Sequence, residues 1–259
     1  MESALTERSD RVAAALKLQR TVGRRRAARF LAEGPNLVEA ALRRGLVSDV
    51  LVTESANARF ADLLAEAPVH LITEKAAKAL SETVTPVGLF AVCTQPEVRL
   101  ADVLGADPRL VLVAVDTSEP GNAGTLIRIA DALGADAVVL AGDSVDPYNG
   151  KCLRASAGSI FAVPVLEEPD VSALLAALSD AGLMVLATTL DGELALADAD
   201  LSAPTAWVFG SEAHGLSADL AALADVRVHI PMRGGAESLN IAAAAAICLY
   251  QSASRIQES

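Results

Sequence analysis

The sequence predicts an α/β protein in which strands and helices alternate through two domains. Hydrophobic residues make up 52% of the 259 residues, but aromatic residues only 3%, so the core must be built from Ala, Val, Leu and Ile. That mixture suits helices packed on a parallel sheet. The segment LVLVAVD, residues 110–116, supports this prediction, because an apolar run without polar alternation is typical of a strand buried on both faces.

Short segments of both kinds alternate through the first hundred residues. We expect strands at 29–34, 48–54, 69–73 and 88–93, and helices at 36–45, 58–67 and 74–83. Gly45 is a natural stop for the first of these helices. Residues 94–109 carry two prolines and little periodicity, which indicates a connection. We therefore interpret 1–97 as an α/β/α domain with a basic N-terminal segment, and 98–109 as a linker.

The alternation continues in a larger domain, residues 110–259. Strands are expected at 110–116, 135–142, 183–190, 205–212 and 226–232, and helices at 121–134, 150–158, 171–182 and 216–225, with a long helix at the end of the chain. Strands and helices in this order predict a doubly wound parallel sheet. In such sheets, ligands bind beyond the carboxyl ends of the strands.

Three polar loops that contain glycine follow three of these strands. The first, TSEPGNAGTLIR, places Arg128 nearly two helical turns after Asn122. The second, SEAHGLS, carries Glu212 and follows Gly210, which permits close approach of the backbone. The third, RGGAESLN, leads into a helix of alanines for which Ser238 is the expected N-cap. Each loop alone fits a turn or a cap, but together they indicate a binding site. GNAG does not fit the GxGxxG dinucleotide fingerprint.

Charge, cysteines and hydropathy narrow the class of protein. The net charge is −12, yet ten of the 21 basic residues lie between Arg8 and Arg44 beside only three acidic ones. That segment is either a solvated helix face or an RNA-facing patch.

The cysteines and histidines are scattered, which argues against a metal site and favours buried thiols. The longest apolar run has ten residues, too few to cross a membrane, and no secretory signal is recognisable. We expect a cytoplasmic protein.

The segments GNAGTLIR, GSEAHGL and IPMRGGAESLN resemble, in order, the three motifs of the SpoU/TrmH family of RNA ribose 2′-O-methyltransferases. LRASAGSIFAVPV is similar to the segment before the family's central helix. FLAEGPNLVEAAL and TPVGLFAV resemble parts of the L30e-like RNA-binding domain of its ribosomal members. Nearly the whole chain after Gly23 is covered, and it looks most like 23S rRNA methyltransferases, including the thiostrepton-resistance type.

This resemblance implies a C-terminal SPOUT domain with a parallel sheet and a deep trefoil knot, working as a homodimer. The knot would hold the cofactor S-adenosyl-L-methionine (AdoMet), and no metal is expected. By motif, the cofactor-binding residues are Thr188, Gly210, Ser211, Glu212, Ile230, Met232 and Leu239.

The resemblance also implies catalytic roles. Arg128 would act on the target hydroxyl, with Asn122 fixing the loops, Glu212 and Ser238 holding the cofactor, and Asn240 supporting the turn into the last helix. Two versions stay open for Arg128: it removes the hydroxyl proton, or it orients the hydroxyl and its phosphate. Guanidinium groups normally stay protonated, which argues against proton removal by Arg128. In a shared site, one subunit would provide Arg128 and the other the AdoMet pocket.

RNA would be held by the basic N-terminal region. We expect contacts from Arg24, Arg25 and Arg26, and from Arg154, for which a surface arginine is the competing interpretation. The L30e-like domain favours rRNA as the substrate over tRNA. A tRNA ribose 2′-O-methyltransferase and a non-catalytic RNA-binding protein on the same fold remain the alternatives.

Overall fold

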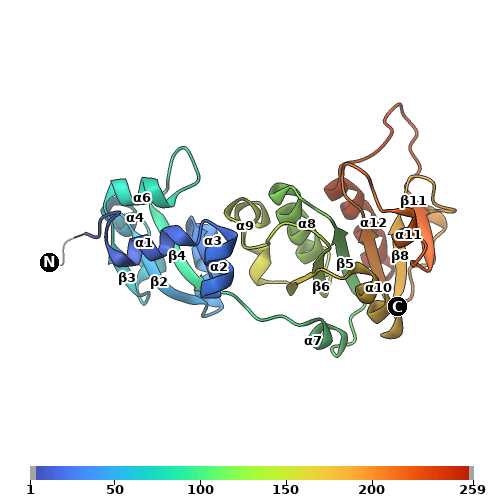
Figure 1. The fold of residues 1–259 in the computed structure, drawn as a ribbon, viewed down its shortest axis with the longest axis horizontal. Helices are drawn as coiled ribbons and strands as arrows, with labels where there is room; N and C mark the ends of the chain where they lie inside the picture. Colours follow the sequence, from blue (N-terminus) through green and yellow to red (C-terminus); the bar gives the residue numbers. More distant parts are fainter. Residues whose placement is uncertain (1–3, 257–259) are drawn as a thin grey trace. The chain divides into compact units, whose positions relative to one another are not determined.

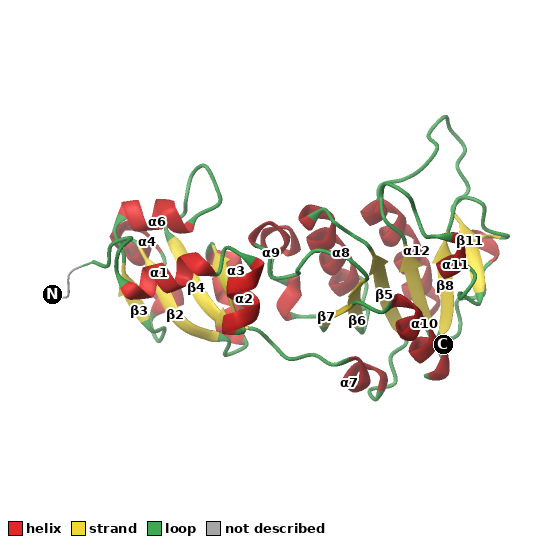
Figure 2. Cartoon of the chain, in the orientation of Figure 1, coloured by secondary structure: helices red, strands yellow, loops and turns green. Residues whose placement is uncertain are grey.

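The computed structural model describes residues 4–256 and consists of two compact units, in both of which helices and strands alternate (Figures 1 and 2). The first unit holds the chain up to Glu97 together with Tyr148–Phe161. The second holds Val98–Pro147 and the chain from Ala162 onwards. The chain therefore passes from one unit to the other at three points. No pattern in the sequence indicated that residues 148–161 belong with the first unit.

The first unit is built on a mixed sheet of four strands. These are β1 (Arg29–Glu33), β2 (Val47–Val52), β3 (Val69–Leu71) and β4 (Leu89–Thr94). Their order is β1-β4-β2-β3, with β4 antiparallel to both of its neighbours and β2 parallel to β3. All four overlap the predicted strands.

Helices surround this sheet. They are α1 (Asp10–Lys17), α2 (Thr21–Ala27), α3 (Pro35–Arg43), α4 (Glu54–Arg59), α5 (Ala61–Leu64), α6 (Glu74–Leu80) and α9 (Gly150–Ser156). The helix predicted at 58–67 is wrong in extent, because the chain breaks at Phe60 between α4 and α5. Helices α1 and α6 bury Val12 and Leu80 in a common cluster with Phe90 of the sheet.

Arg24 ties the first two helices together. Its side chain lies on α2 and is only 1% exposed. The guanidinium donates to the carbonyls of Leu18 at 2.9 Å and Gln19 at 3.1 Å, and to the Thr21 hydroxyl at 2.9 Å. It thus satisfies carbonyls that the end of α1 leaves without partners. This is a structural role in place of the predicted RNA contact, because a guanidinium enclosed by these acceptors does not face solvent.

The second unit is built on seven strands. These are β5 (Leu110–Val115), β6 (Ala137–Ala141), β7 (Val165–Glu168), β8 (Met184–Thr188), β9 (Leu194–Ala195), β10 (Thr205–Phe209) and β11 (Val226–His229). Their order is β7-β6-β5-β10-β8-β11-β9, and every neighbouring pair is parallel. The predicted parallel sheet is confirmed, although β7 and β9 were not foreseen.

Helices cover both faces of this sheet (Figure 1). They are α7 (Leu100–Leu104), which lies inside the predicted linker, α8 (Pro120–Ala132), α10 (Val171–Asp180), α11 (Ala218–Ala221) and α12 (Ile241–Ile256). Leu174 and Leu178 of α10 pack on Val113 of β5. On the other face, α12 contacts β10 and α8, and the indole of Trp207 donates to the Ser252 hydroxyl at 2.8 Å.

The three cysteines are buried, as expected. Burial raises the pKa of the Cys93 and Cys248 thiols to about 12, so both stay protonated at neutral pH. Within residues 4–256, no helix is both long and apolar enough to cross a bilayer. The same residues contain no group of three His, Cys, Asp or Glu side chains placed to hold a metal ion.

Replacing Arg24 by methionine should destabilise the protein by about 3 kcal/mol, because it leaves buried carbonyls without donors. Chemical denaturation of the full chain would measure the loss. Arg26→Met is the matched control, since Arg26 is exposed in the same turn, and it should cost less than about 0.5 kcal/mol. Equal losses for the two variants would contradict the role assigned to Arg24.

Candidate active site

The three polar loops meet at the carboxyl ends of the second unit's strands. Strand β5 continues to β6 and β7 on one side, while β10 and the remaining strands lie on its other side. Between β5 and β10 is therefore the switch point at which parallel sheets bind ligands. Asn122 stands in the first turn of α8, Glu212 follows β10, and Asn240 precedes α12. These three side chains come together there.

One carboxylate oxygen joins the three loops. Glu212 Oε1 accepts hydrogen bonds from the Asn122 amide at 2.5 Å and from the Asn240 amide at 2.9 Å. The Asn240 amide also donates to Asn122 Oδ1 at 3.3 Å. Hydrogen bonds to an ionised acceptor are stronger than neutral ones. Residues that are 118 positions apart in the chain are thus held in one small network.

Asn240 has a second role at the start of α12. Its Oδ1 accepts from the backbone N–H of Ala242 at 2.9 Å, which is the work of an N-cap residue. The prediction that Ser238 caps this helix is wrong, because α12 begins only at Ile241. Ser238 lies instead in the exposed segment 231–240 and contributes to the wall of a cavity.

A cavity of about 860 Å³ opens beside this network. That volume lies in the usual range for a small-molecule site. The loops after β8, β10 and β11 and the start of α12 form its walls. All seven residues predicted to bind the cofactor line it: Thr188, Gly210, Ser211, Glu212, Ile230, Met232 and Leu239.

Gly210 is required for the shape of one wall. A Cβ atom at this position would lie 2.2 Å from the backbone of both Gly215 and Leu216. The loop folds back because the Gly215 N–H donates to the Ser211 carbonyl at 2.8 Å and the His214 N–H to the Ser211 hydroxyl at 3.3 Å. The prediction of a close backbone approach at Gly210 is confirmed.

Four further lining residues were not among the predicted cofactor-binding residues. They are residues 189–191, which follow the predicted Thr188, and His229, whose Nδ1 donates to the Gly192 carbonyl at 2.8 Å. Gly192 lies against β11 so closely that a Cβ would come within 2.7 Å of the Val228 backbone. A signal was available, because TTLDG is a fourth polar, glycine-containing loop at the end of an apolar strand.

The cavity wall also holds an unsatisfied polar atom. Thr189 Oγ1 is buried and has no hydrogen-bond partner among the described residues. Buried hydroxyls without partners are rare in native proteins, so this atom is suited to a bound ligand. The residues Asp191, Glu212 and Glu237, each with a carboxylate, also line the cavity. Together with the backbone groups of the Gly210 loop, they match the ribose hydroxyls and the cationic groups of AdoMet.

The remaining predicted residues lie away from this cavity. Arg128 is exposed on α8 and is not among the cavity's described lining residues. Arg25 and Arg26 are exposed in the last turn of α2. Arg154 lies on α9 in the first unit, where it pairs with two carboxylates. The structure thus unites Asn122, Glu212 and Asn240 without bringing the arginines to them.

Two family models match the chain. The SpoU rRNA Methylase family matches residues 109–250, and the MRM3-like substrate binding domain matches residues 9–91. Among curated proteins, the chain is 38% identical over 222 residues to 23S rRNA (guanosine(2553)-2′-O)-methyltransferase RlmP from Bacillus subtilis, covering 85% of this chain and 87% of the relative.

Solved structures agree in fold. An AdoMet-bound rRNA methyltransferase from Sinorhizobium meliloti superposes with a TM-score of 0.87 at 28% identity, covering 98% of both chains. The SpoU methyltransferase AviRb from Streptomyces viridochromogenes, in complex with AdoMet, gives a TM-score of 0.85 at 30% identity, covering 96% of this chain and 98% of that one. With the motif residues gathered at one switch point, these matches show that the chain belongs to the SpoU rRNA methylase family.

Proposed function

We propose that this protein transfers a methyl group from AdoMet to the 2′-hydroxyl of a ribose in RNA, with 23S rRNA as the favoured substrate. The observation that carries the proposal is the cavity beside the Glu212 network, which is lined by every residue predicted to bind the cofactor. RlmP, which is similar over most of this chain, is named as a 23S rRNA methyltransferase.

The cavity fits AdoMet, which would supply an activated methyl group when bound. Backbone groups of the loop from Gly210 to Leu216 would hold its polar parts, and the Thr189 hydroxyl would gain the partner that it lacks. The Glu212 carboxylate would keep its bonds to Asn122 and Asn240, so that the loops retain their shape. A trefoil knot through these loops is part of the proposal.

The ribose must be aligned with the methyl group, and positioning of this kind supplies much of the rate enhancement in group transfer. Arg128 is the residue proposed for this task. Because a guanidinium normally stays protonated, we assign Arg128 to orienting the hydroxyl and its phosphate, with water or another group accepting the proton. Its exposed place outside the cavity wall favours a role toward the cavity of a second copy.

A homodimer would bring that second copy into place. Helix α12 carries large apolar side chains that face solvent, Ile247 at 40% and Tyr250 at 66% exposure. Ala243 lies one turn before Ile247 on the same face and is also exposed. Such a stripe of apolar residues on a helix is suited to pack against another protein surface. We propose that α12 contributes to the dimer interface.

RNA would bind the first unit through its exposed arginines. Arg25 and Arg26 lie in the last turn of α2, and Arg29, also exposed, is the first residue of β1. Three guanidinium groups in five residues suit phosphate contacts. Few aromatic side chains are available for base stacking, so phosphate and 2′-hydroxyl contacts would dominate. A cytoplasmic site of action belongs to this proposal, since ribosomal RNA is the favoured substrate.

The activity itself is tested with labelled AdoMet and separate pools of unmodified rRNA and tRNA. We expect label in rRNA, at a ribose whose 3′ linkage resists alkaline cleavage, because alkaline hydrolysis needs the free 2′-hydroxyl. Label in tRNA alone would identify a tRNA enzyme. Label in neither pool, with RNA still bound, would identify a non-catalytic RNA-binding protein.

A composite site can be tested by mixing two inactive variants. Arg128→Ala should reduce transfer at least 100-fold while AdoMet affinity and Tm stay close to wild type. Gly210→Val should abolish AdoMet binding. Co-refolded in equal amounts, the two variants should recover about a quarter of wild-type activity, because half of the dimers are mixed and each has one intact site. No recovery would place Arg128 and the cofactor in the same subunit.

Gly210→Ala should weaken AdoMet binding at least tenfold, equivalent to about 1.4 kcal/mol, because the added Cβ meets the backbone of Gly215 and Leu216. Isothermal titration calorimetry with AdoMet measures the change. Gly234→Ala, in the loop after β11, is the matched control, since its Cβ would meet nothing within 4 Å. If both variants bind AdoMet like wild type, the Gly210 loop does not shape the cofactor site.

A further inference from the structure

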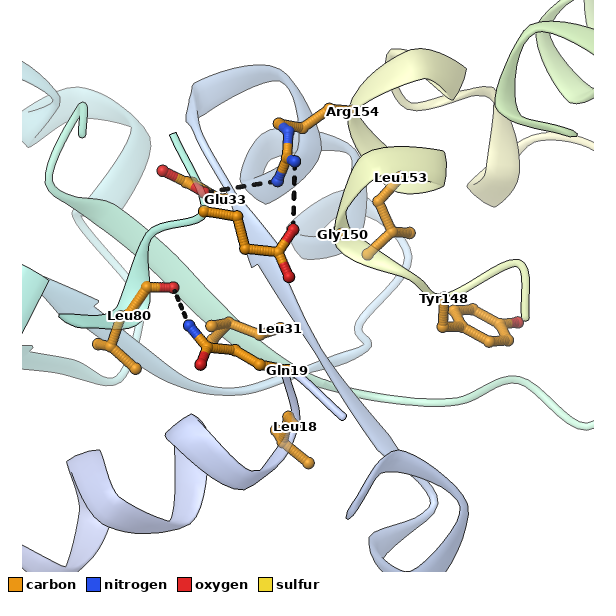
Figure 3. A pocket seen from close by; sticks show the side chains of 10 residues that line it. Leu18, Gln19, Leu31, Glu33, Leu80, Tyr148, Gly150, Leu153 and Arg154 are labelled. Carbon is orange, nitrogen blue, oxygen red and sulfur yellow. Dashed lines mark hydrogen bonds and ion pairs between the residues drawn. The ribbon is translucent and has the colours of Figure 1, made fainter. Parts of the chain in front are cut away.

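The first unit is completed by a segment from the middle of the chain. Residues 148–161 lie inside the stretch that matches the SpoU rRNA Methylase family, yet they pack with the residues before 98. Helix α9, from this segment, packs against β1. Figure 3 shows Arg154 of α9 beside Glu33 of that strand, and Leu153 and Leu31 line the same small pocket.

Arg154 makes the polar half of this attachment. Its Nη2 lies 3.2 Å from Glu82 and its Nη1 lies 3.7 Å from Glu33 (Figure 3). The Glu33 side chain is only 10% exposed and also accepts hydrogen bonds from the hydroxyls of Ser81 and Thr83. The guanidinium thus joins α9 both to β1 and to the loop that follows α6.

Aromatic side chains make the apolar half of the attachment between the 148–161 segment and the first unit. Phe30 of β1 is fully buried, and its ring lies 4.7 Å from that of Tyr148 and 5.9 Å from that of Phe161, measured between centroids. The partners of Phe30 are thus the first and last residues of the segment. Cys152 and Leu153, from the middle of the segment, are also buried. Both ends of the segment and its middle are therefore anchored on the first unit.

We propose that Arg154 is a positioning residue for the RNA substrate, holding the 148–161 segment on the substrate-binding unit; this rests on the function proposed above. The chain crosses between the units after Glu97, Pro147 and Phe161. While residues 148–161 are packed on the first unit, all three crossings of the chain link this unit, with its bound RNA, to the methyltransferase unit. Once the segment is released, only the crossing after Glu97 remains, and a looser connection lowers the effective concentration of the bound ribose at the cavity.

The carboxylates around Arg154 make it possible to distinguish this role from a direct contact between Arg154 and a phosphate. Glu33 and Glu82 already compensate its charge, and both would repel a phosphate placed beside it. If Arg154 bound phosphate, removing the charge of Glu82 would strengthen RNA binding. If Arg154 holds the segment in place, removing Glu82 and removing Arg154 act in the same direction, because either change breaks the same ion pair.

A double-mutant cycle on the full-length protein tests this prediction. The variants are Arg154→Met, Glu82→Gln and both together, with Lys151→Met as a control that removes one positive charge from the same helix. Transfer to rRNA is measured below the melting temperature of every variant, with AdoMet affinity and hydrogen exchange of residues 150–156 alongside.

We expect each single variant to lower kcat/KM for rRNA about tenfold and to speed hydrogen exchange in α9, with AdoMet affinity unchanged. The double variant should be no worse than Arg154→Met alone, and Lys151→Met should stay within twofold of wild type. A loss of kcat/KM in Arg154→Met together with an unchanged or increased kcat/KM in Glu82→Gln would overturn the proposal in favour of a direct RNA contact. Wild-type kcat/KM in all variants would leave Arg154 with a purely structural role. Absence of transfer by the wild type would instead reject the proposed function.

Discussion

The second unit depends on the meeting of three loops at one carboxylate. A parallel sheet brings the carboxyl ends of β5 and β10 side by side, but it does not dictate how the loops beyond them are shaped. Glu212 supplies that constraint, because its oxygen accepts from amides on two other loops. Glu212 also lines the cavity, and its partner Asn240 caps the start of α12. Neighbouring charges and amides in such a network stabilise one another more than isolated pairs do.

Basic and acidic side chains are concentrated at different places in the two units of the protein. Exposed arginines gather at the end of α2 and the start of β1, whereas the cavity is lined by three carboxylate residues together with Arg227. The exposed arginines make the first unit the part of the protein suited to a polyanion. The net charge of −12 describes neither surface, which is why overall charge is a poor guide to partners in a protein of this kind.

Regular elements and motif positions could be predicted from the sequence, because they depend on local patterns. The run at 110–116 is typical of a strand buried on both faces, and it becomes β5, an interior strand of the sheet between β6 and β10. The motifs identified Asn122, Glu212 and Asn240 as site residues, whereas the hydrogen bonds that join them were found only in the structure. Other features depend on distant contacts. Arg24 is buried because carbonyls at the end of α1 need donors, and Asn240 is the cap instead of Ser238 because α12 starts at Ile241, directly after Asn240. No local pattern shows that residues 148–161 pack on β1.

The packing of residues 148–161 on the first unit affects how domains can be exchanged between related enzymes. The chain looks modular, with a substrate-binding domain followed by a methyltransferase domain, and an exchange at residue 97 would be the obvious way to graft a new RNA specificity. The structural module is not contiguous, however, because Phe30 and Glu33 find their partners in Tyr148 and Arg154. A chimera joined only at residue 97 would combine a foreign aromatic and acidic surface with the native α9. Domain shuffling in this architecture therefore requires two exchanged segments, and single crossovers between diverged relatives should yield few functional proteins.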